Sequence, residues 1–580
     1  MRRCIGGVPW VLLWAAGLVA CGDDETAGTG DVAGEDAAPD TGEEAGDAAD
    51  PGTDGGAGGD EGGAAEDAGE ADAPVPGALY VDGTLGAGEC ADYDPVGRAC
   101  GGGDARAFRT LAGAVAVVEP GDVVYVRAGT YNEPLVPSVS GADGSPVVWA
   151  AYPGEAPVLT GDWHPAAIRL DGVEWQVFDG LHVERARWLE ARSAHHNVVR
   201  NCVFLDSPAT GTTGNVRFVS SHFNRIEGNT IAGGQDNLLL IDSDRNVVQG
   251  NTIAEGAHSL LGIRCGDFNV VRGNRFSNTL QKAGEVYDCG ADTSAVPNAF
   301  ASTTHNLFEH NWFTETDRYY STSGGNGIQY AGQDGILRRN VFINANVGLG
   351  MQVYEDEALH NERNRIYHNV FWGNECAGVS LEGVGQVDNR FRNNVLAGNH
   401  GWAGDCAGEG PGQLLYRSPV AGYEFRRNVL WAGAAGAEVI QEEFGAGSTL
   451  AAFEAAHPAA FADNLELDPA FIDAAGGEFT PAAGSGLVDA GLPLAAARGA
   501  GSGTSLPVDD ARWFYDGYGI PGETGDRIRL AGGDATARVV AIDYDAGVLT
   551  LDASLTWTDG QGVSLAWEGA APDIGPVELR

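Results

Sequence analysis

An asparagine recurs through the middle of this chain, and each time a short apolar step follows it, as in Asn229-Thr230-Ile231. Nine positions carry this pattern: Asn201, Asn229, Asn251, Asn274, Asn311, Asn340, Asn369, Asn394 and Asn428. The intervals between them are 28, 22, 23, 37, 29, 29, 25 and 34 residues. A repeat of this length, with strand-like apolar pairs and Gly or Asn corners, is typical of a solenoid, in which each coil packs on its neighbours.

A second small or polar residue sits five positions before most of these asparagines. Eight positions align in this way: His196, Asn224, Asn246, Asn269, Asn306, Gly335, Asn364 and Asn389. Buried backbone groups at a bend need hydrogen-bond partners, and an asparagine amide supplies both a donor and an acceptor. We therefore expect the asparagines to form internal ladders at the corners of the coils, with Val, Ile, Leu and Phe pointing inward.

The first 21 residues read as a targeting segment and not as part of the fold. Arg2 and Arg3 precede an apolar stretch, residues 5–20, that is too short for a lasting membrane span. The stretch ends in Leu-Val-Ala followed by Cys21, which resembles the lipobox of bacterial lipoproteins. The resemblance implies that Cys21 becomes the lipidated N-terminus. Gly22 follows it in place of an aspartate, which favours the outer membrane or cell surface.

Residues 22–76 consist almost entirely of Gly, Ala, Asp, Glu, Thr and Pro, and we expect a disordered acidic linker there. The whole chain has a formal net charge of −47, which excludes nucleic acid as a partner. Lys282 is the only lysine in the sequence. Any membrane contact is expected through the lipid anchor alone, and the protein is expected to be monomeric.

The ordered part begins with segments that alternate between strand-like and helix-like patterns: residues 78–82, 108–115, 121–126, 146–150 and 153–159. This opening, followed by the asparagine repeats, resembles right-handed parallel β-helix proteins of the pectate-lyase-like superfamily. The resemblance implies an all-β solenoid over residues 77–485 with a short helix capping its first coil. Residues 486–580 are expected to close the solenoid with a small antiparallel β module, because residues 527–530, 537–542, 548–551 and 563–567 alternate like strands.

Seven cysteines remain after Cys21, and an exported protein can oxidise them. Proximity in the sequence suggests three disulfides: Cys90–Cys100, Cys265–Cys289 and Cys376–Cys406. This pairing leaves Cys202 buried and free.

Function in a β-helix is expected on turns that lengthen on neighbouring coils. The interval between Asn274 and Asn311 is the longest, and we assign its extra length to a loop over residues 279–292. That loop contains Lys282, Glu285, Tyr287 and Asp288. Equivalent turns of neighbouring coils would add Asp236, Glu255, His258, Arg318, Tyr319 and Tyr320.

These residue types suit β-elimination of a uronate polysaccharide, in which the substrate carboxylate is neutralised, a base removes the adjacent proton and an acid protonates the leaving oxygen. The hypothesis assigns Lys282 as the base, Arg318 as the group that neutralises the carboxylate, and Tyr287 or Tyr319 as the acid. His258 and Tyr320 would bind substrate. Calcium would be held by Asp236, Glu255, Glu285 and Asp288.

Two alternatives remain open at this stage. A pair of carboxylates, Asp317 with Glu285 or Asp236, would suit a glycoside hydrolase. A lipid anchor, an acidic tether and a long solenoid also suit a surface adhesin that binds glycan without cleaving it. All three hypotheses place the protein in the cell envelope with a polysaccharide as its partner.

Overall fold

The computed structural model describes residues 75–161, 163, 165–207, 215–287, 303–316, 325–351, 361–382, 386–400, 412–416, 422–442 and 446–579. The targeting segment with Cys21 and nearly all of the acidic linker lie outside these ranges. Lipidation of Cys21 and disorder of the linker therefore stay predictions. No helix in the described ranges is long and apolar enough to cross a membrane.

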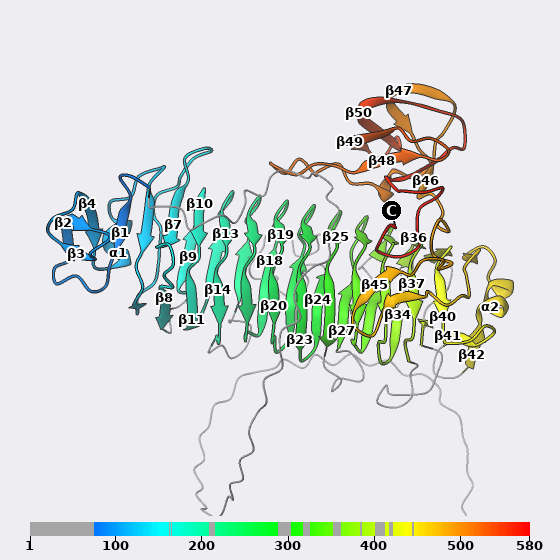
Figure 1. Cartoon of the computed structure of the whole chain (residues 1–580), viewed down its shortest axis with the longest axis horizontal. Coiled ribbons are helices and arrows are strands. Elements are labelled where there is room, and N and C mark those ends of the chain that lie inside the picture. Colours follow the sequence, from blue (N-terminus) through cyan, green and yellow to red (C-terminus); the bar gives the residue numbers. More distant parts are fainter. Residues whose placement is uncertain are drawn as a thin grey trace, which may run out of the picture. The chain divides into compact units, whose positions relative to one another are not determined.

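Three sheets of stacked strands form a parallel β-helix (Figure 1). Sheet A joins, in order, β1 (Leu79–Val81), β5 (Val123–Val126), β7 (Val147–Ala151), β10 (Gln176–Asp179), β13 (Val198–Arg200), β16 (Arg225–Glu227), β19 (Val247–Gln249), β22 (Val270–Arg272), β25 (Leu307–Glu309), β28 (Ile336–Arg338), β32 (Arg365–Tyr367), β36 (Asn389–Arg392), β39 (Tyr423–Arg426) and β43 (Phe461–Ala462).

Sheets B and C complete each coil. Sheet B joins β6 (Thr130–Tyr131), β8 (Val158–Gly161), β11 (His182–Ala186), β14 (Val203–Leu205), β17 (Thr230–Ala232), β20 (Thr252–Ala254), β23 (Arg275–Thr279), β26 (Trp312–Thr316), β29 (Val341–Ile343), β33 (Val370–Trp372), β37 (Val395–Ala397) and β40 (Val429–Trp431). Sheet C joins β9 (Ile168–Asp171), β12 (Leu189–Arg192), β15 (Val216–Val219), β18 (Asp236–Ile241), β21 (Ser259–Arg264), β24 (Lys282–Tyr287), β27 (Asn326–Tyr330), β30 (Val347–Met351), β34 (Ala377–Leu381), β38 (Leu414–Tyr416), β41 (Glu438–Glu442) and the antiparallel β42 (Ala446–Thr449).

The expected fold class, a right-handed parallel β-helix with small antiparallel elements at its C-terminal end, is confirmed. A short pair, β31 (Asn361–Glu362) and β35 (Gln386–Val387), joins two turns of the helix. Helix α2 (Leu450–Ala456) and the hairpin of β44 (Phe471–Asp473) and β45 (Glu478–Pro481) follow the last coils.

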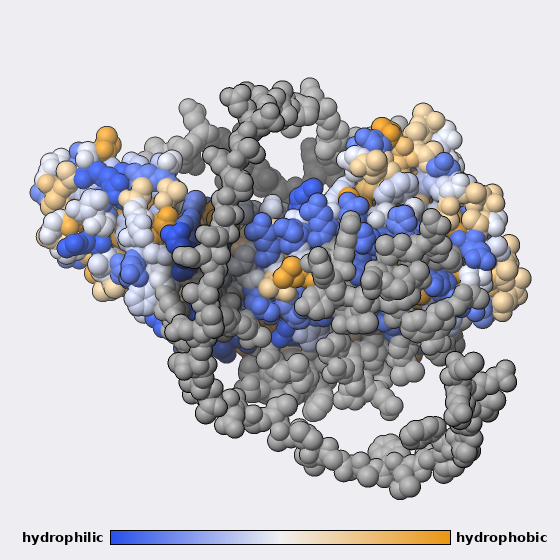
Figure 2. All heavy atoms as spheres, turned by 90° about the horizontal axis from the view of Figure 1, so that it is seen from below, coloured by the Kyte–Doolittle hydropathy of each residue, from blue (hydrophilic) through white to orange (hydrophobic). Residues whose placement is uncertain are grey.

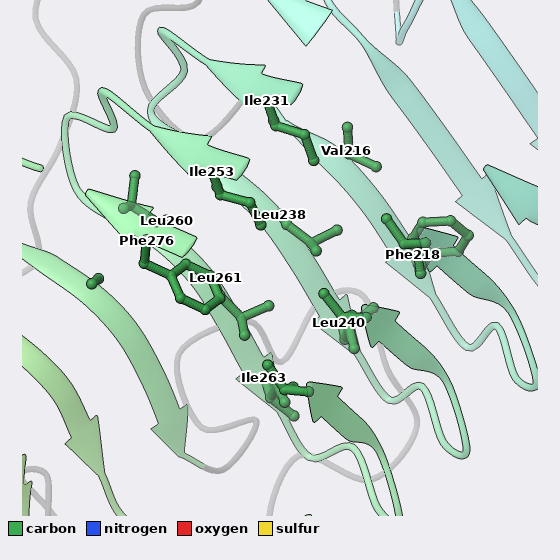
Figure 3. Packing of buried hydrophobic residues seen from close by; sticks show 14 of the residues in the cluster. Val216, Phe218, Ile231, Leu238, Leu240, Ile253, Leu260, Leu261, Ile263 and Phe276 are labelled. Carbon is green, nitrogen blue, oxygen red and sulfur yellow. The ribbon is translucent and has the colours of Figure 1, made fainter. Parts of the chain in front are cut away.

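Inward side chains form one continuous core because the register is constant from coil to coil. On sheet C, Phe218, Leu240 and Ile263 occupy the same inward position and are fully buried (Figure 3). On sheet B, the rings of four stacked phenylalanines are parallel to within 9°, with centroids 4.8 Å apart: Phe276, Phe313, Phe342 and Phe371. Like side chains stack here because strand pairing places equivalent positions about 4.8 Å apart.

The expected asparagine ladders are present and buried. In the longer ladder each side-chain amide donates a hydrogen bond of 2.8 to 3.0 Å to the amide oxygen of the next asparagine: Asn229, Asn251, Asn274, Asn311, Asn340, Asn369, Asn394, Asn428 and Asn464. Asn201 was wrongly placed in this series. Its amide bonds instead to Asp179, and the backbone N–H of Cys202 occupies the ladder position below Asn229.

The N-terminal end of the solenoid is capped as expected. Helix α1 (Leu111–Val115) begins at Thr110, whose hydroxyl accepts a hydrogen bond from the N–H of Gly113. An antiparallel unit of β2 (Glu89–Asp94), β3 (Ala99–Cys100) and β4 (Ala105–Phe108) joins the edge of sheet A.

One predicted disulfide is confirmed in full. Cys90 and Cys100 are bonded, and Cys202 is buried and free as predicted. Cys265 and Cys376 are each disulfide-bonded. Their predicted partners, Cys289 and Cys406, lie outside the described residues, so those two pairings stay predictions.

The C-terminal module is one antiparallel sheet in the order β46 (Ala495–Ala496), β51 (Gly562–Leu565), β48 (Arg527–Leu530), β49 (Thr536–Asp543), β50 (Val548–Trp557) and β47 (Gly501–Pro507). A 3-10 turn, η2 (Ala511–Trp513), lies between β47 and β48. The aromatic residues of this segment pack inward: Trp513, Phe514, Tyr515 and Tyr518 are no more than 6% exposed. These four side chains therefore belong to the module's core and are not arranged to bind glycan.

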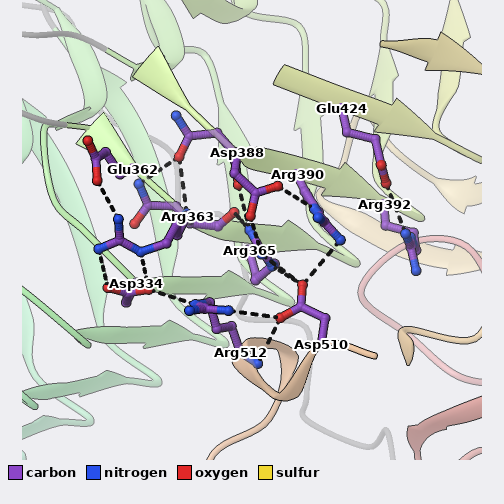
Figure 4. Close-up of polar contacts among 12 residues, drawn as sticks. Asp334, Glu362, Arg363, Arg365, Asp388, Arg390, Arg392, Glu424, Asp510 and Arg512 are labelled. Atoms are coloured by element: carbon purple, nitrogen blue, oxygen red, sulfur yellow. Dashed lines mark hydrogen bonds and ion pairs between the residues drawn. The ribbon is translucent and has the colours of Figure 1, made fainter. Parts of the chain in front are cut away.

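Ion pairs hold the module against the outer face of sheet A. Arg338 forms two hydrogen bonds of 2.7 Å with Asp526, and Arg365 lies 2.7 Å from Asp510. The contacts of Arg365 and Asp510 continue through further arginines and carboxylates from neighbouring coils (Figure 4). Since Arg338, Arg365 and their two partners are buried, the sheet and the module neutralise each other's charge.

Candidate functional site

Lys282 is the first residue of strand β24 in sheet C, and it does not lie in a loop as we expected. Residues 282–287 pair with β21 before them and β27 after them. We predicted a loop because Ala283 and Gly284 give this segment little apolar pattern. The prediction was wrong, because small inward side chains are compatible with a strand whose neighbours fill the core. The extra length of this coil therefore follows Tyr287, at residues that the structure does not describe.

The sheet register brings four of the expected site residues together as the His258 cluster: Asp236 of β18, His258 on the turn before β21, and Lys282 and Glu285 of β24. Asp236, Ser259 and Lys282 align at the beginning of these three strands. Asp236 Oδ1 lies 2.6 Å from Nδ1 of His258 and accepts a 2.9 Å hydrogen bond from the hydroxyl of Ser259. Lys282 Nζ donates a hydrogen bond to Glu285 Oε1, and the same oxygen lies 3.9 Å from His258 Nε2.

A histidine and a lysine thus face two carboxylates in the order Asp236, His258, Glu285, Lys282. Lys282 and Glu285 are 5% and 3% exposed, whereas the side chain of His258 is 29% exposed. His258 is consequently the member of this group that solvent, or a ligand, reaches most easily.

The contact between His258 and Asp236 shifts the pKa of both groups. The hydrogen bond to Asp236 is the main cause that raises the pKa of His258 above its ordinary value, and the Glu285 carboxylate adds to it. Burial alone would raise the pKa of Asp236, but hydrogen bonds from His258 and Ser259 lower it below its usual range. An ionised carboxylate only accepts hydrogen bonds, so Nδ1 of His258 carries a proton and Nε2 is the basic atom of the neutral ring.

Tyr287 lies at the other end of β24, in register with Arg264 of β21, whose guanidinium is 5.0 Å from the centroid of the Tyr287 ring. Glu255 is exposed on the turn between β20 and β21, with a positive φ of 57°. Among the described residues it makes no hydrogen bond or ion pair with the His258 cluster, so the structure does not bring Glu255 into that cluster.

Five other candidates lie outside the described residues, and their assignments stay predictions: Asp288, Asp317, Arg318, Tyr319 and Tyr320. The sequence pattern did not reveal Ser259, which belongs to the cluster, or Arg264, which contacts the ring of Tyr287. An alignment of whole coils on their apolar steps would have found Ser259, because it occupies the position of Asp236 one coil later.

The donor set of this cluster does not fit calcium. Calcium takes six to eight oxygen ligands. Asp236 already faces His258, and Glu285 already bonds to Lys282, so both carboxylates have cationic partners. Among the described residues, three metal-ligating side chains converge only at Cys90, Asp92 and Cys100, where both sulfur atoms form the disulfide. Calcium binding by this protein is therefore still only a prediction from the sequence.

The view in Figure 2 shows hydrophilic residues interspersed with small apolar patches over the coloured part of one face. No broad apolar surface is visible among the coloured residues of this face.

A family model matches part of the β-helix. Residues 180–336 match the family described as periplasmic copper-binding protein (NosD), and this match spans β11 to the beginning of β28. The match includes every residue of the His258 cluster. No curated protein is significantly similar to the chain in sequence.

Solved structures of polysaccharide lyases are similar to this chain at low sequence identity. The pectate lyase Pel9A is 14% identical, with 87% of this chain and 96% of that chain covered and a TM-score of 0.38. A variant of the family 6 alginate lyase AlyGC is 15% identical, covering 58% of this chain and 52% of that one, with a TM-score of 0.40. A family 6 polysaccharide lyase from Pseudopedobacter saltans is 13% identical, covering 63% and 92%, with a TM-score of 0.36.

Proposed function

We propose that this protein is an envelope protein that acts on an acidic polysaccharide by β-elimination at the His258 cluster of sheet C. One observation carries the proposal: a partly exposed histidine, oriented by the buried Asp236, lies beside the only lysine of the chain. A base next to a fixed positive charge is what removal of a proton adjacent to a carboxylate requires.

The residues take the following roles in this proposal. Neutral His258 removes, through Nε2, the proton on the carbon next to the uronate carboxylate. The electron pair of that C–H bond forms the new C=C bond, and the β C–O bond breaks with its electrons on the leaving oxygen. A water molecule protonates that oxygen, because Tyr287 lies at the far end of β24 from the His258 cluster.

Lys282 has a different role from the one expected. Its ammonium group donates a hydrogen bond to Glu285, so in this proposal it acts through its positive charge, which stabilises the negative charge that develops on the uronate carboxylate. We therefore assign proton removal to His258, and Lys282 becomes the group that lowers the energy of the charged intermediate.

A second candidate is binding without cleavage, as in an adhesin. The burial of Lys282 and Glu285 favours it, because a substrate must approach both groups closely for elimination. In either case we place the protein in the cell envelope, anchored through Cys21. The leader pattern supports this location, and the NosD family is described as periplasmic.

The test is absorbance of the unsaturated uronate product from pectate, alginate and glycosaminoglycans. We expect His258→Ala to lower kcat by about 10²- to 10⁴-fold, the usual contribution of a general base. His182→Ala on the outer side of sheet B is the matched control and should leave kcat unchanged. The absence of unsaturated product from all three polymers would reject elimination, and equal activity of His258→Ala and the unaltered protein would reject this site.

A further inference from the structure

The outer faces of sheets A and C differ in how their arginines are neutralised. On sheet A, Arg272, Arg338 and Arg365 each meet a carboxylate of the C-terminal module, at 2.9, 2.7 and 2.7 Å. No such module covers the corresponding face of sheet C in the described part of the chain. One outward arginine of sheet C meets no carboxylate in the described part of the chain.

Arg217 of β15 shows this most clearly. Its neighbours Val216 and Phe218 point into the core and are fully buried, so Arg217 points outward. Its register neighbour Glu190 is ion-paired with Arg192 at 2.5 Å. Arg217 has no carboxylate partner among the described residues, and its buried Nε atom has no hydrogen-bond partner there.

Arg217 also shares a register row with the proposed reaction site. The row runs Arg217, Leu239, Gly262, Glu285 across β15, β18, β21 and β24. Neighbouring strands are about 4.8 Å apart, so Arg217 lies about 14 Å along the solenoid from Glu285. Leu239 leans over Gly262, where an added Cβ would lie 2.6 Å from Leu239 Cδ2, so the floor between the two charged residues is apolar.

We propose that Arg217 is a carboxylate-binding subsite that holds a second uronate unit of the same polymer, several sugar units from the one at His258. A guanidinium group binds a carboxylate with two parallel hydrogen bonds, and a half-buried one does so with little competition from water. The distance between the two sites makes the ligand an oligomer, since one sugar unit is too short to reach both. This inference rests on the proposed function in one respect, namely that the His258 cluster binds the same polymer. It concerns binding of the polymer and does not require that the polymer is cleaved.

The test measures binding and not turnover, so it is informative even if the protein does not cleave. Oligogalacturonate, oligoalginate and heparosan oligomers are titrated calorimetrically into the full protein carrying His258→Ala, with and without Arg217→Gln. We expect Arg217→Gln to weaken binding of the best oligomer about tenfold, the usual effect of one charge-assisted bidentate contact. Arg217→Lys should recover part of the lost affinity, because lysine keeps the positive charge but cannot form the two parallel hydrogen bonds of a guanidinium group.

Two controls make the outcome specific. Arg527→Gln removes an exposed arginine of the C-terminal module and should leave affinity unchanged. A carboxyl-reduced form of the same oligomer should bind equally to the proteins with and without Arg217. Equal affinity of Arg217→Gln and its parent for the acidic oligomer, or no binding of any acidic oligomer, would overturn the inference.

Discussion

Nδ1 of His258 lies 2.6 Å from Oδ1 of Asp236, although 22 residues separate the two in the chain. The turn before β21 carries the histidine, and the first position of β18 carries the aspartate. The contact exists because adjacent coils stack in register, so the beginning of β18 lies next to the turn that leads into β21. It sets the protonation state on which the proposed chemistry depends.

Asp236→Asn should lower the pKa of His258, because the largest cause of its raised value is the bond to this carboxylate. The acid limb of a kcat/KM profile, which follows neutral His258, should move to lower pH. NMR titration of the His258 ring checks the shift without any activity. Asp463→Asn, a substitution on an exposed turn, should leave the titration where it is.

The same pair gives a pH dependence of stability with a defined sign. The folded protein holds the His258 proton more tightly than the unfolded chain does, so the stabilisation is full below the unfolded pKa, about 6.5. It is lost as pH rises through the higher folded pKa. Urea unfolding of the unaltered protein and of His258→Gln should therefore show a difference in unfolding free energy that shrinks above neutral pH. A constant difference would contradict the linkage.

Asn340→Ala should remove the middle of the longer asparagine ladder. The side chain of Asn340 accepts hydrogen bonds from the N–H and the amide of Asn311 and donates to Asn369 and to the carbonyl of Phe308. Several buried groups lose their partners together, at about 1–3 kcal/mol each. Hydrogen exchange of the flanking coils and denaturant unfolding measure the loss, with Asn201→Ala, outside the ladder, as the mild control.

Phe313→Ala should create a cavity in the middle of the phenylalanine stack on sheet B. Phe313 is fully buried with neighbouring rings 4.8 Å away on both sides. The expected cost is about 3–5 kcal/mol in unfolding free energy. Phe313→Leu, which keeps most of the volume, should cost much less, and equal losses for the two variants would show that the stack is not tightly packed.

Asp526→Ala should loosen the C-terminal module from sheet A. The substitution leaves the buried guanidinium of Arg338 with one carboxylate, Glu309, in place of two. Breaking a buried pair from one side costs about 3–5 kcal/mol, and faster proteolysis within residues 495–565 would report the loss. Asp534→Ala removes an exposed partner of Arg529 and should cost less than about 1 kcal/mol.

Replacing both members of that pair separates lost charge pairing from lost packing. Arg338→Met with Asp526→Leu fills the same space with apolar side chains and should recover much of the stability lost in Asp526→Ala. No recovery in the double variant would mean that the geometry of the ion pair, and not only its neutrality, holds the module in place.

Local pattern was enough to predict the solenoid, the ladders, the N-terminal helix and the antiparallel module. Apolar pairs such as those after Asn229 and Asn340 recur once in every coil. They are buried when similar coils stack on one another. The Cys90–Cys100 disulfide could also be predicted, since the two cysteines are only 10 positions apart in the sequence. Asn201 was assigned to the ladder although the ladder position of its coil is the next residue, Cys202. The error arose because an exposed corner asparagine and a ladder asparagine have the same flanking pattern.

The sequence by itself determined which residue types the site contains: a single lysine with acids, a histidine and a tyrosine at the corresponding part of three coils. Only the tertiary structure decided that Lys282 is nearly buried against Glu285 and that His258 is the most exposed member of the group. It also placed Arg217 in the register row of Glu285 and Asp526 against Arg338. Pairing and exposure depend on register and on docking between distant segments, and both arise from contacts across coils, which periodicity along the chain does not specify.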